Sequence, residues 1–293
     1  MIYLILTGFC FGSIGIFVKK IGASISPLGI AIIRLLTTAF LMFLLVSTRR
    51  SFEELRLQGS RDLVLVLLGG LVGFGATMGF YIKSLQIIPV ADAVFLHFVS
   101  FPLFTLLYTI FLTEDRIEGY DLASFTMALL GIFFIYGVSF QPHSQHYLGY
   151  TFGFISGVCY SLMMIFMKVY GTDKTLYGTI FWPVLIGGLG LVPFGILEGL
   201  TFQLRTGTLY HLAGLVVIST FLGYTLMARG VASVKAHHAS IALIIAEPLS
   251  AVLLAWLVLG EALSLQVGIG GALILLSSIL LYRRRSPDQP VVE

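Results

Sequence analysis

Charged residues are scarce in this chain of 293 residues. Asp, Glu, Lys and Arg together make up 11% of the sequence, against 58% hydrophobic residues and a mean hydropathy of +1.00. A soluble domain of this length cannot bury so much apolar surface. The composition therefore excludes an ordinary soluble protein and predicts an all-α integral membrane protein in contact with a lipid bilayer.

Cysteine and catalytic motifs are also scarce. The two cysteines, Cys10 and Cys159, lie inside apolar segments and form neither a disulfide framework nor a metal-ligand spacing. The sequence has no HExxH, GxGD or GxSxG motif, so we predict neither an enzyme nor a bound cofactor or metal. Most of the 17 Lys and Arg separate apolar runs instead of forming one basic face, which argues against a nucleic-acid partner.

Apolar segments of helix-spanning length occur throughout the chain, joined by short connections. They cover residues 2–18, 27–48, 63–84, 90–112, 119–138, 149–168, 175–197, 209–230, 237–259 and 264–282. The sequence therefore predicts ten transmembrane helices. Residues 286–293 are polar and proline-containing, and we expect them to form a disordered cytoplasmic tail.

The two halves of the chain resemble each other. A shift of 146 residues that places Pro248 on Pro102 also aligns Arg229 with Lys83, Glu261 with Asp115 and Tyr282 with Tyr136, and a shift of 149 aligns Gly157 with Gly8 near the two starts. We therefore predict two five-helix repeats, residues 1–146 and 147–285. Because each repeat has an odd number of helices, the second must enter the membrane in the opposite sense, and such inverted repeats are typical of secondary transporters.

Positive charges are unevenly distributed between alternate connections. With the N-terminus in the cytoplasm, 12 of the 17 Lys and Arg lie on the cytoplasmic side, four lie outside and Arg34 lies within a helix. Basic residues favour the cytoplasmic side of a membrane. We therefore predict that both termini are cytoplasmic, although the outer pair Lys19 and Lys20 argues the other way.

Glu247 and Pro248 stand together in the middle of an apolar segment. A carboxylate at this depth needs a cavity or a partner. We predict that Glu247 binds the substrate or couples transport, and that Pro248 and its counterpart Pro102 break their helices. The alternative is a structural Glu247 that accepts hydrogen bonds from donors freed beside Pro248.

Two further polar residues fall inside apolar segments. His97 lies one helical turn before Phe101, the counterpart of Glu247, and is expected to face the same cavity. An interhelical hydrogen bond alone is the other interpretation of His97. Arg34 lies about two turns below the end of its helix, where it can bind substrate, extend to the interface or pair with Asp92.

Two sequence elements carry a resemblance to a known family. They read SPLGIAIIRLL at residues 26–36 and IIAEPLSAVLLAWLVLGEALSLQ at residues 244–266. With the two five-helix halves, they resemble the EamA-domain branch of the drug/metabolite transporter superfamily over nearly the whole chain. The first half departs from the pattern, because Phe101 stands where the carboxylate precedes the proline. The resemblance implies a bacterial inner-membrane carrier, commonly an exporter of amino acids or related metabolites.

The resemblance also indicates which helices line the substrate pocket. Aromatic residues on these helices become candidates for substrate contact, although packing or lipid contact would equally explain them: Phe80, Tyr81, Phe98, Phe101, Tyr160, Trp182 and Tyr224. We expect a transporter that exports a small apolar or zwitterionic metabolite by alternating access around a central cavity. A passive channel or facilitator is the alternative, and the sequence leaves open proton coupling and oligomeric state.

Overall fold

The computed structural model describes residues 2–88, 90–112, 118–136, 144–171, 174–203, 205–234, 236–260 and 265–283. Within these ranges every regular element is helical, apart from an isolated antiparallel bridge between Ile25 and Phe202. Seven helical segments there are long and apolar enough to cross a membrane: Ile2–Ile21, Pro27–Arg49, Gly59–Ser84, Tyr147–Gly171, Leu176–Glu198, Thr206–Ala232 and Ile241–Val258. The protein is therefore an all-helical, multi-pass membrane protein.

Helices cover each of the predicted apolar segments. In the first half they are α1 (Ile2–Gly12), α2 (Ile14–Ile21), η1 (Gly22–Ser24), α3 (Pro27–Arg49), η2 (Phe52–Leu55), α4 (Gly59–Leu68), η3 (Gly69–Ala76), α5 (Thr77–Ile87), α6 (Val90–Leu112) and α7 (Gly119–Tyr136). In the second half they are α8 (Ser144–Gly171), α9 (Leu176–Glu198), α10 (Thr206–Gly214), η4 (Leu215–Leu222), α11 (Gly223–Ala232), α12 (Ala236–Leu259) and α13 (Leu265–Arg283).

The two halves share an unusual local feature. Eight-residue π-helical turns, η3 and η4, interrupt the third apolar segment of each half. They begin at Gly69 and Leu215, which are 146 residues apart, the shift that aligns Pro102 with Pro248. π-helical turns are rare and often occur at functional sites. Their equivalent positions support a duplicated unit, while its inverted orientation stays a prediction.

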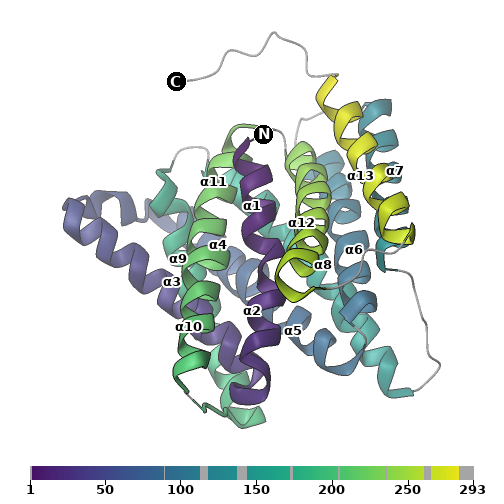
Figure 1. Ribbon diagram of the computed structural model, residues 1–293. Coiled ribbons are helices and arrows are strands. Elements are labelled where there is room, and N and C mark those ends of the chain that lie inside the picture. Colours follow the sequence, from purple (N-terminus) through teal and green to yellow (C-terminus); the bar gives the residue numbers. More distant parts are fainter. Residues whose placement is uncertain are drawn as a thin grey trace.

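Helix packing divides most of the chain into two groups. In the first bundle, α1 packs on α11 and α12, α2 packs on α10, and α3 packs on η4. In the second bundle, α8 packs on α5, α6 and η3, and α9 packs on η3. Each bundle contains helices of both halves, and exchanging the halves converts one set of contacts into the other. Helices α3 and α9 join the bundles on one side of the molecule, and the packed pair α7 and α13 lies on the other (Figure 1).

Glycine permits the closest helix contacts within each bundle. A Cβ added to Gly8 would meet the backbone of α12 at Glu247 N, 2.9 Å away, and one added to Gly157 would meet α6 at Phe101 N, also 2.9 Å away. These glycines occupy equivalent positions in the two halves. Small residues allow helices in a membrane to approach closely.

Gly157→Ala should lower the melting temperature of the detergent-purified protein. The added methyl group would collide with the rigid backbone of α6, and overpacking of this kind costs about 1–3 kcal/mol. Gly15→Ala is the matched control, because Gly15 is also helical but faces open space. Its substitution should leave stability unchanged or raise it slightly through helix propensity. Equal melting temperatures for the two variants would contradict the close packing.

The predicted helix break at Pro248 is wrong. Helix α12 continues through this residue from Ala236 to Leu259. A proline removes one backbone donor, and a membrane helix tolerates the loss where a neighbouring hydroxyl or helix compensates. The lost bond is the one that the Ile244 carbonyl oxygen would accept, and α12 continues on both sides of it. Helix α6 likewise extends past position 102, but the side chain of Pro102 lies outside the described residues.

Candidate functional site

A small cavity lies between the two bundles near the middle of the helices. Its lining from the first bundle comprises Phe11, Ile14, Arg34, Tyr224 and Glu247, and its lining from the second comprises Thr77, Met78, Tyr81, His97 and Tyr160. The volume is about 30 Å³, which is roughly the space of one or two water molecules. The cavity is therefore too small for a metabolite and must widen before one can enter.

Arg34 brings a buried cation to the cavity wall. Its side chain is 2% exposed. The Nε atom donates to Thr220 Oγ1 at 3.0 Å, and Nη1 lies 3.7 Å from Met78 Sδ. The π-helical turn η4 orients the acceptor, since Thr220 itself donates to the Leu215 carbonyl oxygen at 2.8 Å. The expected alternative partner, Asp92, has a side chain outside the described residues.

Glu247 faces the same cavity from α12. Close approach of α1 at Gly8 holds this part of α12 in place. The carboxyl is partly buried, and its Oε2 atom has no hydrogen-bond partner among the described residues. Sequence positions 34 and 247 belong to different halves, yet packing places both side chains on one cavity wall.

Unpartnered polar atoms gather around this cavity. Within the described part of the chain, buried atoms without a hydrogen-bond partner include Arg34 Nη2, Thr77 Oγ1, Tyr224 Oη and Glu247 Oε2, all of which belong to lining residues. Buried polar groups in folded proteins are normally paired. The cluster contains a guanidinium donor, a carboxyl oxygen and two hydroxyl groups. It therefore marks a place where a polar ligand or water is needed.

His97 forms the opposite wall with two aromatic residues. Its Nδ1 atom lies 2.8 Å from Ser156 Oγ, and the Ser156 hydroxyl donates to the Gly153 carbonyl oxygen at 2.6 Å. The hydroxyl proton is thus committed, so Nδ1 is the donor and Nε2 is left as an acceptor in the neutral ring. The rings of Tyr160 and Tyr81 lie 5.2 and 4.7 Å from the imidazole. This wall offers aromatic surface for an apolar group.

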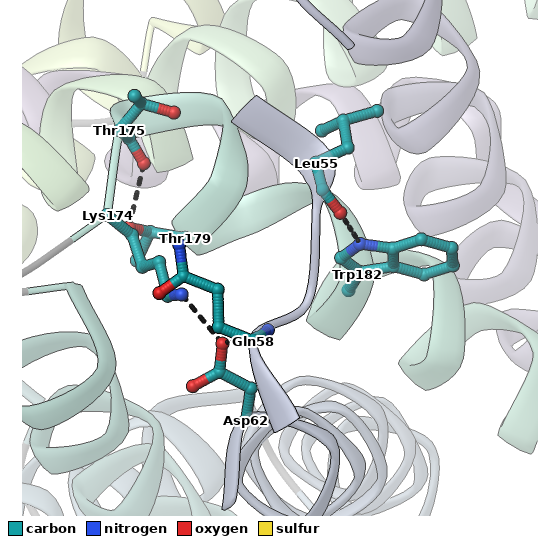
Figure 2. Close-up of polar contacts among 7 residues, drawn as sticks. All are labelled: Leu55, Gln58, Asp62, Lys174, Thr175, Thr179 and Trp182. Carbon is teal, nitrogen blue, oxygen red and sulfur yellow. Dashed lines mark hydrogen bonds and ion pairs between the residues drawn. The ribbon is translucent and has the colours of Figure 1, made fainter. Parts of the chain in front are cut away.

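The remaining aromatic candidates do not line the cavity. Phe80 stacks on Phe152 with ring centres 5.6 Å apart, and Phe98 packs edge-on against His97. Phe101 lies behind Tyr160, 4.3 Å between ring centres. Trp182 donates from Nε1 to the Leu55 carbonyl oxygen at 2.7 Å, at the end of the helices (Figure 2). Sequence alone could not separate these residues from the lining because it does not fix how each helix is rotated.

Sequence reasoning also missed four lining residues. Phe11, Ile14, Thr77 and Met78 border the cavity, but only Thr77 is polar. Thr77 lies four residues before Tyr81 and therefore on the same helix face. That spacing was the available signal. The apolar residues carried none, because apolar side chains fill every face of these helices.

Sequence comparisons identify the family. The family profile described as the EamA-like transporter family matches residues 1–137 and again residues 147–283. The chain belongs to the EamA-like transporter family. This family is part of the drug/metabolite transporter superfamily, so the resemblance found in the sequence is confirmed. The two matched segments correspond to the two halves of this EamA protein.

Several relatives carry transporter names. An "Uncharacterized transporter" of Archaeoglobus fulgidus is 27% identical, over 96% of this chain and 95% of its own. Another, of Clostridium kluyveri, is 24% identical over 96% and 92%. The "Uncharacterized inner membrane transporter YicL" of Salmonella typhimurium is 40% identical over 38% of each chain. A crystal structure with 17% identity shares the fold, with a TM-score of 0.81 over 97% of this chain and 98% of its own.

Proposed function

We propose that this EamA protein is a secondary carrier that exports a small zwitterionic metabolite, such as an amino acid or a derivative, by alternating access around the cavity. Ten helices in two inverted repeats would build it, with both termini in the cytoplasm and the chain in the inner membrane of a bacterium. The uneven distribution of Lys and Arg supports this orientation. The duplicated family match and the equivalent π-helical turns support the repeats.

The observation that carries the proposal is the set of unpartnered buried atoms around a small cavity. Arg34 presents a guanidinium donor that a carboxylate can occupy, and Glu247 presents an oxygen that an ammonium group can occupy. The aromatic wall of Tyr81, His97 and Tyr160 would contact the apolar part of such a solute. A multiply charged anion would need more buried cations than Arg34 provides.

The small volume supports a carrier over a channel. An open pore would require a wide continuous path, whereas the cavity between the described helices measures about 30 Å³. A solute can reach this site only if the bundles separate, and in the proposed cycle they do so on one side of the membrane at a time. Transport of this kind should saturate and should be stimulated by solute on the opposite side of the membrane.

A thermal-shift screen of the purified protein against amino acids and related metabolites should identify the solute, because a ligand bound to the folded state stabilises it by mass action. The solute identified should then show counterflow in proteoliposomes: labelled solute should accumulate transiently when unlabelled solute is trapped inside. Uptake without stimulation by trapped solute would favour a passive facilitator. Empty liposomes are the control for leakage.

A further inference from the structure

The connection between α3 and α4, residues 50–58, is attached to the second bundle. Trp182 on α9 holds it by donating to the Leu55 carbonyl oxygen at 2.7 Å (Figure 2). Asp62 accepts from the Gln58 backbone at 2.7 Å and pairs with Lys174 at 2.6 Å. The Asp62 and Lys174 side chains are only 13% and 10% exposed, which limits screening of the pair by water. This connection leaves the first bundle and is fixed to the bundle that it enters.

The connection after α9 shows the same arrangement in the other half. Residues 199–203 are attached to the turn before α3, in the first bundle. Ser26 N donates to the Thr201 carbonyl oxygen at 3.0 Å, and Gln203 N donates to the Ser24 carbonyl oxygen at 2.7 Å. Ile25 and Phe202 form the antiparallel bridge between them. This connection leaves the second bundle and is likewise fixed to the bundle that it enters.

Each attached connection begins with a residue of positive φ. Arg50 ends α3 with φ +53° and is the one non-glycine residue with positive φ in the described part of the chain. Gly199 ends α9 with φ +80°. The two positions are 149 residues apart, the shift that relates Gly8 to Gly157. At Arg50 this conformation closes the end of α3, where Arg50 N and Ser51 N donate to the carbonyl oxygens of Ser47 and Val46 at 3.1 Å, although a left-handed conformation is unfavourable for an arginine.

We propose that Arg50 and Gly199 are paired hinges of the transport cycle, an inference that rests on the alternating-access function proposed above. Each connection is fixed to the bundle that it enters. A rotation of one bundle relative to the other must therefore change the backbone at the end of the helix from which the connection starts. Hinges are commonly a few residues at element ends that absorb changes in φ and ψ. Between the hinges, α3 and α9 meet through apolar contacts such as Phe43 with Phe181, ring centres 6.4 Å apart, which can slide.

Contacts inside the second bundle support rotation as a unit. Lys83 on α5 pairs with Glu198 at the last position of α9, immediately before the hinge at Gly199. At the other end of α9, the Asp62 and Lys174 pair joins α4 to the segment that precedes α9. Both ends of α9 are thus joined to the helical segment Gly59–Ser84. The proposed hinge at Gly199 lies immediately after the second of these ends.

Gly199→Ala tests the hinge without creating a steric clash. A Cβ added at Gly199 meets no atom within 4 Å, so the substitution acts only through the disfavoured positive φ. If φ changes as the bundles separate, alanine destabilises the closed structure relative to the open one. The ratio of closed to open molecules should fall about tenfold.

Gly59→Ala is the matched control. Gly59 has φ +88° and equally open surroundings, but it lies beyond the attached connection at the start of α4. Its conformation should be the same in open and closed molecules. The substitution should therefore lower the melting temperature without shifting the ratio.

Arg50→Gly should act in the opposite direction. Glycine removes the cost of the left-handed conformation in the closed structure and leaves the open structure unaffected. The ratio of closed to open molecules should rise, again by about tenfold. This variant also serves as the test if Gly199→Ala fails to fold.

The ratio can be measured with pairs of spin labels in liposomes. In a Cys10→Ser/Cys159→Ser background, one label pair at Val169 and Ala232 reports on one end of the bundles, and a second at Lys20 and Tyr147 reports on the other. Opposite shifts for Gly199→Ala and Arg50→Gly, with Gly59→Ala unchanged, support the hinges. Equal behaviour of Gly199→Ala and Gly59→Ala, or an Arg50→Gly distribution identical to wild type, overturns them. Opposite shifts in a protein without counterflow would leave the hinges standing and reject the carrier function.

Discussion

Arg34→Ala should lower the apparent affinity of the carrier for its solute by roughly 10- to 100-fold, because a hydrogen bond to a charged group contributes about 1.5–3 kcal/mol. Arg34 is buried at the cavity, and its Nη2 atom has no partner among the described residues. The substitution would remove the cation available to a substrate carboxylate. Affinity is measured by the concentration dependence of counterflow and of the thermal shift.

Two further variants separate binding from folding. Arg34→Lys keeps the charge but loses the planar pair of donors, so its affinity should lie between wild type and Arg34→Ala. Arg61→Ala removes an exposed cation at the start of α4 and should have no effect. If Arg34→Ala fails to fold and Arg34→Ala/Asp92→Ala recovers, Arg34 is a structural ion-pair member. Normal transport by Arg34→Ala would remove this residue from the site.

Glu247→Gln should change how transport responds to a pH gradient. The substitution preserves the shape of the side chain but fixes it in the neutral state. If the Glu247 carboxyl carries the coupled proton, the variant should keep solute exchange and lose the dependence of net flux on the gradient. If the carboxylate binds the substrate ammonium group, exchange should fall as well, with apparent affinity reduced by roughly tenfold or more. Flux is measured in proteoliposomes with equal and unequal pH on the two sides.

A matched carboxylate and a second substitution complete this test. Glu53→Gln removes an exposed charge outside the cavity and should transport like wild type in both conditions. Glu247→Ala shows what loss of the whole side chain does to stability. If Glu247→Gln also transports like wild type, and Glu247→Ala only lowers the melting temperature, Glu247 has a structural role beside Pro248. The carrier assignment would survive that result, but the role of Glu247 in it would not.

The polar candidates were easier to predict than the aromatic ones. Arg34, His97 and Glu247 all line the cavity, because a polar side chain inside an apolar helix is too costly to face lipid. Phe80, Phe98, Phe101 and Trp182 carry no comparable cost, since aromatic rings pack equally well against lipid, helices or a cavity. Their positions depend on helix rotation, which only packing fixes.

The continuity of α12 through Pro248 shows a second limit of local reasoning. Proline removes a backbone donor and disfavours a helix interior, yet α12 continues through Pro248. Conversely, nothing in the sequence around Arg50 suggested a positive φ. That conformation became visible only with the backbone, where it closes the end of α3 through hydrogen bonds to Val46 and Ser47.

By itself the sequence determined that this is a helical membrane protein of the EamA family, built from two similar halves, with polar residues inside its apolar segments. Composition, helix length and the cost of burying charge are local properties, so the order of residues is sufficient to determine them. The tertiary structure decided which helices of the two halves form each bundle and which side chains meet at the cavity. These depend on helix rotation and on contacts between distant residues, such as Arg34 with Thr220, and packing of the whole chain is what fixes both.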